Sequence, residues 1–137
     1  VVSAALGPVQ GENGGAVEAT KTFATVGSVL FDAVYVPGGA ASVGSLQSGA
    51  AALQFLREAH AHYKPIGATG EAAGLVRTAI AQAAQSKPDS AGGNPLAGVI
   101  LADDASGAFP QEFAAAIGQH RFWERDATQQ IAGTVRP

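Results

Sequence analysis

The residue types and spacing that could support catalysis lie in one stretch, Tyr63 to Val76. This stretch predicts a buried strand over Pro65–Ala68, a tight turn at Thr69–Gly70 and a helix that opens at Glu71. In a parallel sheet such a turn lies at the carboxyl end of a strand, where ligands and nucleophiles sit. A nucleophile elbow needs Ser or Cys at the turn, and this chain has Gly70 there. We therefore interpret Thr69, Gly70 and Glu71 as a vestigial elbow without a catalytic residue.

Five residues near this turn are candidates for binding a ligand. The backbone N–H groups of Gly38 and Gly39 lie between a strand and a helix, where they can bind an anion or simply form a tight turn. Glu71 can act as a base if its pKa is raised, or can be stabilised in a first helical turn by the helix dipole. Together with Glu71, Asp103 and Asp104 could bind a hard cation, although Asp is also ordinary turn chemistry at strand ends.

The three histidines do not predict a metal site. His60 and His62 are two residues apart on one expected helix and face different ways. His120 continues the apolar side of the last expected helix. We therefore assign the histidines packing or surface roles.

The segment Arg121–Arg125, Arg-Phe-Trp-Glu-Arg, clusters aromatic side chains with charges. Trp and Arg are favoured as anchors of protein interfaces. The same residues equally suit a helix end that folds onto its own core. Both interpretations stay open at this point.

Composition narrows the classes of partner. A chain of 137 residues predicts one domain, 1–137. A net charge of −3 with scattered Lys and Arg argues against a nucleic-acid surface, and the longest apolar run is too short for a membrane span. No signal peptide is visible at Val1.

Cys and Met are both absent from the sequence. Without Cys, disulfides, thiolate metal sites and cysteine catalysis are excluded. The two absences suit an oxidant-rich setting, since peroxide oxidises these side chains most readily, but composition bias and chance also account for them. Because no Met can start translation here, we expect a processed form, a fragment or one domain of a longer protein.

The apolar pattern predicts an alternation of strands and helices after an N-terminal hairpin around Asn13–Gly14. The clearest periodicity is in the helix after Gly70, whose apolar residues recur at helical spacing from Ala72 to Ala83. The expected strands are Val1–Leu6, the hairpin strands Val9–Gln10 and Ala16–Ala19, a buried strand over Ala33–Val36 that Val29–Asp32 leads into, and Gly98–Ala102. A helix is expected from Ser42 or Ser45 to His62, and a loop over Lys87–Pro95. The last helix has Pro110 in its first turn and Phe113, Ala116, Ile117 and His120 on one side.

This alternation predicts right-handed crossovers and a mostly parallel sheet with both faces covered. The expected fold is a three-layer α/β/α sandwich of the flavodoxin-like kind.

Several stretches resemble known families. Residues 31–39, 63–68 with the elbow, and 99–104 resemble the PfpI-type branch of the class I glutamine amidotransferase-like fold. More specifically, residues 6–11, 25–32 and the His-Arg-Phe-Trp stretch 120–123 resemble the C-terminal domain of large-subunit haem catalases. The resemblance covers nearly the whole chain.

The resemblance implies a domain without catalysis of its own. Active PfpI-type enzymes carry Cys at the elbow, where this chain has Gly70, and the position often occupied by His is Glu71. No catalytic His is evident around residues 102–105. The first strand and helix of the fold would lie before Val1, and a sheet left without that strand has an exposed edge. We expect upstream sequence, or a separate piece of a nicked chain, to supply it. A stable, cooperatively unfolding monomer of residues 1–137 would count against this expectation.

In the catalase family such a domain is an appendage of the haem-bearing core, linked to assembly and stability and credited with a chaperone-like role. The resemblance therefore implies a parent that breaks down hydrogen peroxide, with haem in the parent core and no cofactor in this chain. The implied partners are the core, sister subunits in a homotetramer, and unfolded client proteins. The alternative is a free-standing PfpI-type hydrolase-like enzyme in which Glu71, Asp103 and Asp104 replace the Cys, although attack on a peptide normally needs an activated nucleophile or a metal.

Overall fold

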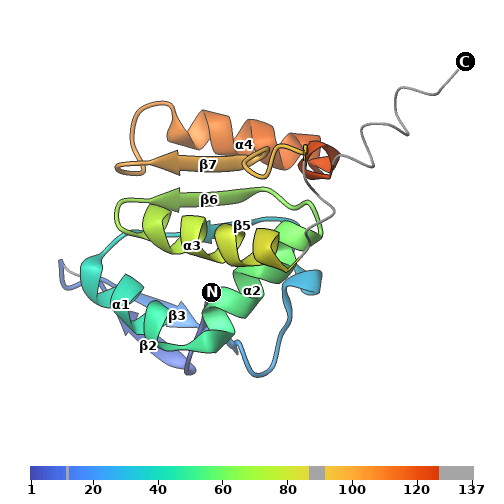
Figure 1. Cartoon of the computed structure of the whole chain (residues 1–137). Coiled ribbons are helices and arrows are strands. Elements are labelled where there is room, and N and C mark those ends of the chain that lie inside the picture. The colour runs from blue at the N-terminus through green and yellow to red at the C-terminus, as the bar shows by residue number, and fades with distance from the viewer. Residues whose placement is uncertain (12, 87–91, 127–137) are drawn as a thin grey trace, which may run out of the picture.

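Figure 1 shows the computed structural model, which describes residues 1–11, 13–86 and 92–126. Part of the expected loop over Lys87–Pro95, and the end of the chain after residue 126, lie outside the described residues. The centre of the fold is a three-stranded parallel sheet in the order β5-β6-β7. Its strands are β5 (Val34–Val36), β6 (Ile66–Thr69) and β7 (Val99–Ala102).

One face of this sheet carries the hydrophobic core. The helices α2 (Ala50–Ala61) and α3 (Ala72–Gln85) pack there, and the buried face of α3 is the one that its periodicity predicts. Alternate strand residues such as Ile66 and Ala68 point into this core because side chains along a strand alternate between faces. The core consists of Val36, Val43, Leu56, Ala59, Ile66, Ala68, Ala72, Leu75, Val76, Ala79 and Ile80.

The opposite face is covered by α4 (Phe109–Gln119), which begins with Pro110 in its first turn as predicted. Helix α4 lies close because β6 has Gly67, where a Cβ would stand 3.0 Å from the Phe113 ring. The rings of Tyr35 and Phe109 meet on the same face, 5.6 Å apart. Helices on both faces make the α/β sandwich that the sequence predicts (Figure 1).

The N-terminal quarter forms two small sheets. The predicted hairpin is confirmed: β2 (Gly7–Gln10) and β3 (Ala16–Ala19) pair antiparallel with Val9 opposite Val17. The strand predicted over Val1–Leu6 is shorter, since only β1 (Val2–Ser3) forms, in parallel with β4 (Lys21–Thr22).

The single helix predicted from Ser42 or Ser45 to His62 is wrong in two respects. It is divided at Gly49 into α1 (Ala40–Ser48) and α2, because Gly49 has an extended backbone. Helix α1 also begins earlier than predicted, after Gly39, and no side chain at its N-cap residue makes a capping hydrogen bond. A hydrogen bond from the Gly39 N–H to the Glu71 carboxylate takes the place of the expected serine cap.

The strand predicted over Ala33–Val36 is confirmed, since β5 runs over Val34–Val36. The stretch that leads into it begins with a short 3-10 helix, η1 (Ser28–Leu30). The carbonyl of Ser28 accepts a hydrogen bond from the Lys64 ammonium. The side chains of Val29 and Leu30 are exposed.

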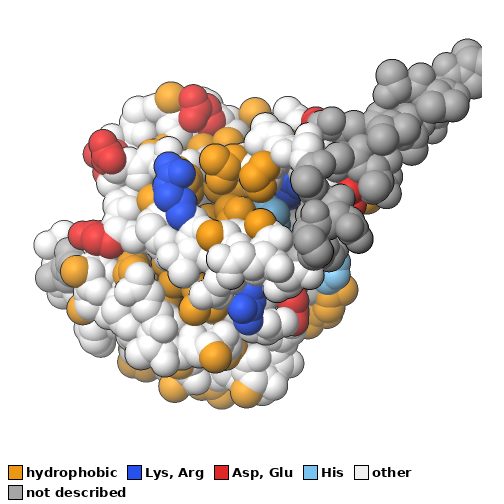
Figure 2. All heavy atoms as spheres, viewed as in Figure 1, with side chains coloured by type: hydrophobic (Ala, Val, Ile, Leu, Met, Phe, Trp, Pro, Cys, Tyr) orange, Lys and Arg blue, Asp and Glu red, His pale blue; other side chains and the backbone are white. Residues whose placement is uncertain are grey.

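The predicted apolar side of the last helix is partly wrong. Phe109 and Ala116 are buried, but Ile117 is 42% exposed and His120 lies just past the end of α4, largely exposed. A second 3-10 helix, η3 (Trp123–Arg125), follows. In Figure 2 charged side chains stand singly on the viewed face, with apolar side chains between them. Among the described helices none is long and apolar enough to cross a membrane.

Candidate functional site

At the carboxyl ends of β5 and β6 the structure brings two predicted turns together. The N–H of Gly39 donates to Glu71 Oε2 at 2.9 Å, and the N–H of Gly38 donates to Thr69 Oγ1 at 3.2 Å. The N–H groups considered for anion binding are therefore bonded to side chains of the chain itself. The N-terminus of α1, which has no cap of its own, is held by the Glu71 carboxylate.

Thr69 is the buried centre of this site, with 3% of its surface exposed. Its Oγ1 lies 2.9 Å from the hydroxyl of Tyr35, which comes from the neighbouring strand. Gly38 must lack a side chain here, because a Cβ would stand 3.0 Å from the carbonyl oxygen of Thr69 and 3.2 Å from Glu71 Oε2. The two turns are thus packed closely together.

Gly70 keeps the backbone of an elbow. Its φ is +55°, in the left-handed region that favours glycine, and its N–H donates to the carbonyl of Ala102 at 2.9 Å. A Cβ at this position would lie 3.4 Å from the carbonyl oxygen of Asp103. A side chain at residue 70 would be strained by this backbone conformation, and glycine has no side-chain atom that could act as a nucleophile.

Hydrogen bonds lower the pKa of two carboxylates of the site, Glu71 and Asp104. The hydrogen bond from the Gly39 N–H holds the pKa of the exposed Glu71 below its usual range, opposite to the direction that a general base needs. Asp104 accepts hydrogen bonds from the hydroxyl and the N–H of Ser106, and these lower its pKa as well. Within the described residues no group of three or more carboxylate, imidazole or thiol side chains could hold a metal. Glu71, Asp103 and Asp104 do not form the cation site that the sequence allowed.

The histidines are dispersed. His60 Nε2 lies 2.7 Å from the carbonyl oxygen of Pro95, and His120 Nε2 lies 3.6 Å from Asp32 Oδ1. His62 caps the C-terminus of α2 through its backbone.

The opposite end of the sheet contains an arrangement that sequence reasoning missed. Arg125 is only 5% exposed, and its guanidinium donates to three carbonyl groups. Nε reaches Ala97 at 2.7 Å, Nη1 reaches His60 at 3.0 Å and Nη2 reaches Lys64 at 2.7 Å. Burial lowers the pKa of Arg125 to about 10, so it remains a cation at neutral pH. It connects α2, β6 and the approach to β7.

Lys64 is a second buried cation at this end, with 3% of its surface exposed. Its Nζ donates to the carbonyl of Ser28 at 2.6 Å. Burial, together with the positive charge of Arg121, lowers the pKa of Lys64, and the charge of Asp32 opposes that shift. Arg125 was visible in the sequence only as part of the Arg-Phe-Trp-Glu-Arg segment, and Lys64 only as part of the stretch before the predicted strand at Pro65. Phe122 and Arg125 of this segment are buried in the fold itself, whereas Trp123 is 51% exposed.

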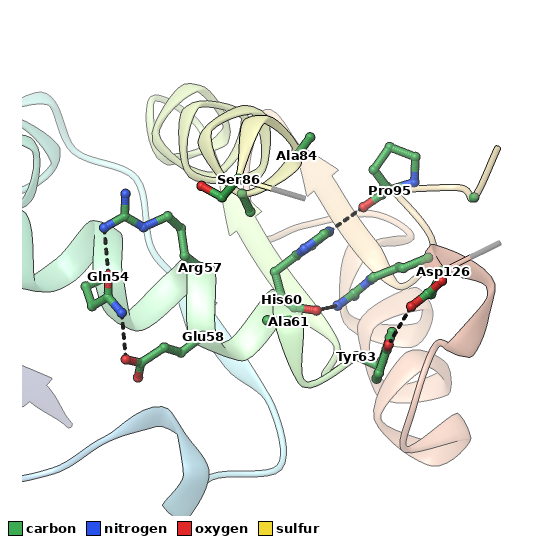
Figure 3. A pocket seen from close by; sticks show the side chains of 13 residues that line it. Gln54, Arg57, Glu58, His60, Ala61, Tyr63, Ala84, Ser86, Pro95 and Asp126 are labelled. Carbon is green, nitrogen blue, oxygen red and sulfur yellow. Dashed lines mark hydrogen bonds between the residues drawn. The ribbon is translucent and has the colours of Figure 1, made fainter. Parts of the chain in front are cut away.

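A pocket of about 570 Å³ lies beside Arg125, between the C-terminal ends of α2 and α3 (Figure 3). Its polar side chains contact one another. The Arg57 guanidinium donates to Gln54 at 2.7 Å, and the Tyr63 hydroxyl donates to Asp126 at 3.2 Å. Burial and this carboxylate raise the pKa of Tyr63. The pocket can hold a small molecule, and the hydroxyls of Ser86 and Tyr63 that line it donate to Gln82 and Asp126. No sequence pattern indicates it, because distant segments form its wall.

Comparison with known proteins gives one consistent result. A family model described as the C-terminal domain found in long catalases matches residues 1–127. Catalase HPII of Mycobacterium avium is 39% identical over 124 residues, covering 87% of this chain and 17% of that protein. Catalase HPII of Pseudomonas aeruginosa is 38% identical over 127 residues, covering 93% and 16%. Catalase-2 of Bacillus subtilis is 35% identical over 127 residues, covering 91% and 16%. The chain thus spans only 16 or 17% of the length of these relatives.

Proposed function

The chain belongs to the family of C-terminal domains found in long catalases, and from this premise we propose that it is a non-catalytic accessory domain of a haem catalase. In this proposal the parent breaks down hydrogen peroxide in its core. Residues 1–137 form one PfpI-type domain that supports assembly and stability of a homotetramer.

The observation that carries the proposal is the state of the elbow. Its backbone is retained, with Gly70 in the left-handed conformation, but the reactive position has no side chain. The neighbouring N–H groups of Gly38 and Gly39, which could stabilise an oxyanion, are bonded to Thr69 and Glu71 instead. A domain that keeps the frame and fills its polar groups internally fits an accessory role.

The proposal assigns haem to the parent core. Both tyrosines of the chain already have side-chain partners in this domain. The hydroxyl of Tyr63 donates to Asp126. The hydroxyl of Tyr35 is bonded to Thr69.

The outer edge of β5 supports a longer parent chain. Among the described residues β5 pairs only with β6, which leaves one edge open. An open edge favours pairing with another strand. We infer that sequence upstream of Val1, or a separate piece of a nicked chain, supplies the missing strand and helix of the fold.

The test is to delete residues 1–137 from the full-length protein. We expect the deletion to lower the temperature of irreversible inactivation and to weaken the tetramer, while the haem Soret band and the peroxide turnover per haem persist. Unchanged assembly and unchanged thermal stability would refute the accessory role. The intact mass and visible spectrum of the source protein provide the first check, since a short haem-free chain would contradict the proposed parent.

A chaperone-like role has its own supporting observation. The β2–β3 hairpin and the residue before it expose apolar side chains, with Leu6 67%, Val9 36% and Val17 56% accessible. Exposed apolar surface can bind unfolded clients. We expect the protein to suppress aggregation of a heat-unfolded client, and the double variant Val9→Ser and Val17→Ser to suppress it less. Absence of suppression in the unmodified protein would remove this role.

The alternative, a hydrolase-like enzyme that uses carboxylates, makes a different prediction. Its base would be Glu71, which here is engaged with the Gly39 N–H. If any hydrolase activity is detected, Glu71→Gln should abolish it under this alternative. Activity that survives the substitution would eliminate the alternative.

A further inference from the structure

We propose that the surface at the amino ends of the strands is the face through which this domain docks on the haem-bearing core of its parent, an inference that rests on the proposed function. We call this surface the amino-end face. It consists of Val29, Leu30, Asp32, His120, Arg121 and Trp123.

Side-chain contacts join the two segments of this face. Lys64 Nζ donates to Ser28 at the start of η1, and the neighbouring Tyr63 ring lies 4.7 Å from the ring of Trp123 in η3. Asp32, which follows η1, lies 3.6 Å from His120 and 3.9 Å from Arg121. Figure 1 shows both 3-10 helices at the end of the sheet from which the strands begin. Residues about 90 positions apart in the sequence therefore share one surface.

The face has the composition of a specific interface. Val29 is 71% exposed, Leu30 66% and Trp123 51%. Single exposed apolar residues are ordinary, but here three lie on two segments that are linked by the contacts of Asp32 with His120 and Arg121, a cluster that contains both signs of charge. An aromatic anchor beside an arginine is typical of the residues that dominate binding energy at interfaces.

The exposed side chains stand on rigid supports. The turn that carries Val29 and Leu30 is held by the buried Lys64, and the turn that carries Trp123 is held by the three carbonyl contacts of Arg125. Preorganised groups lose little conformational entropy on binding. Promiscuous surfaces use flexible, often Met-rich contacts, and this chain contains no Met. These features favour one defined partner.

The parent core is the partner that this geometry and the comparisons favour. The chain corresponds to only 16 or 17% of the length of its catalase relatives, so most of such a protein lies outside the described domain. A covalently attached partner is present at high effective concentration. The remainder of the parent chain therefore binds the amino-end face in preference to partners that are free in solution.

The first experiment compares two valines in the intact full-length protein. Because this chain contains no Cys, Val29→Cys and Val17→Cys each introduce one thiol into it, at positions 71% and 56% exposed. The unmodified protein serves as the blank. We expect maleimide to label the Val29→Cys variant at least about tenfold more slowly than the Val17→Cys variant in the native protein, and equally fast in denaturant. Equal native rates would overturn the proposal.

A photo-crosslinker attached to the thiol of the Val29→Cys variant then identifies what covers the face. Cross-linked peptides from the haem-bearing core support the proposal. Peptides from residues 1–137 of a second copy, or from an unrelated protein, overturn it.

A matched pair of leucines measures the strength of docking. Leu30 and Leu6 are 66% and 67% exposed, on and off the amino-end face. In the full-length protein, Leu30→Asp should accelerate release of the domain by limited proteolysis at least about tenfold, and Leu6→Asp should not. Equal release would overturn the proposal. If deletion of the domain impairs assembly while position 29 stays accessible, only the proposed face is wrong. If deletion has no effect while position 29 is protected, only the accessory role is wrong.

Discussion

The two ends of the parallel sheet differ in the backbone groups that side chains bond there: N–H donors at the carboxyl ends of the strands and carbonyl acceptors at the amino ends. At the carboxyl ends, helices begin and present free N–H groups, and these are bonded to oxygen acceptors of Thr69 and Glu71. At the amino ends, helix α2 finishes and presents free carbonyl groups, and His60 in its last turn accepts from Arg125. Helix ends carry partial charges of these signs. The type of side chain at each end therefore follows from the direction of the elements.

The charged side chains at the two ends of the sheet differ in burial, so their replacement should differ in its effect on stability. Glu71 is exposed and replaceable by water, whereas Lys64 and Arg125 are 3% and 5% exposed and bond to carbonyls that water cannot easily reach. A buried polar group without its partner is costly. At the carboxyl end the buried side chain is the uncharged Thr69, with 3% of its surface exposed. The amino end is the anchored one, and substitutions there should have the larger effects.

The largest effect is expected from Arg125. Replacing it with Met leaves the carbonyls of Ala97, His60 and Lys64 without their donor and should lower the free energy of unfolding by about 3–5 kcal/mol. Arg121→Met is the control and should cost less than about 1 kcal/mol, because Arg121 contacts exposed groups, the carbonyl of His120 at 2.7 Å and Asp32 at 3.9 Å. Pulse proteolysis of the full-length protein in urea, followed on the peptides of this domain, measures both. Similar losses of unfolding free energy for the two variants would show that the buried arginine contributes no more to stability than the exposed one.

Two glycines with left-handed backbones test the same comparison. At the amino end a Cβ on Gly98, with φ +67°, would stand 2.1 Å from the Phe122 ring. At the carboxyl end a Cβ on Gly70, with φ +55°, would meet its nearest atom at 3.4 Å. Gly98→Ala combines overpacking with backbone strain and should cost about 2–4 kcal/mol, against about 1 kcal/mol for Gly70→Ala. Denaturation midpoints that reverse this order would show that the amino end can relax.

The sheet and the helices on it were predictable from the sequence because their signals are local. Helix α3 repeats apolar residues at helical spacing, and the buried strands are short apolar runs bounded by turns. The 3-10 helix η1 was not predicted, and the carbonyl of its first residue, Ser28, bonds Lys64, which lies far along the chain. The predicted start of α1 was wrong because the Glu71 carboxylate, rather than a serine side chain, accepts a hydrogen bond at the N-terminus of this helix. Local patterns do not encode such tertiary contacts.

In the candidate site, too, local patterns were predictable from the sequence and tertiary contacts were not. The sequence placed Gly38, Gly39 and Glu71 near one another through the order of strands in a parallel sheet, and the structure brings them together. It could not show that Glu71 would occupy the N–H groups of the other turn. Arg125 was visible only as part of an aromatic and charged segment, and the carbonyls that it holds come from three separate segments.

A moderate effect is expected from Thr69, the buried residue at the carboxyl end. Thr69→Val keeps the shape but leaves the N–H of Gly38 and the hydroxyl of Tyr35 without this partner. The loss should be about 1–2 kcal/mol by urea unfolding. Thr78→Val is the control, since Thr78 bonds the carbonyl of Gly74 on the exposed side of α3, and it should cost less than about 0.5 kcal/mol. Equal losses would mean that the contact between the two turns contributes little.

The smallest effect is expected from Glu71, and its sign is set by pH. The N–H of Gly39 lowers the pKa of Glu71 in the folded chain, so the unfolded chain binds a proton at higher pH than the folded one. The stabilisation is therefore fully present above about pH 5, where the unfolded carboxyl is also ionised, and is lost as the pH falls through the folded pKa. The melting temperature of the unmodified protein should exceed that of Glu71→Gln by a constant small amount at neutral pH, and the difference should shrink below about pH 4. Glu112→Gln removes the same charge from an exposed site on α4 and controls for net charge. A difference that grew on acidification would mean that protonated Glu71 is the form the fold prefers, and the carboxyl end would then resemble a site poised for general-base chemistry after all.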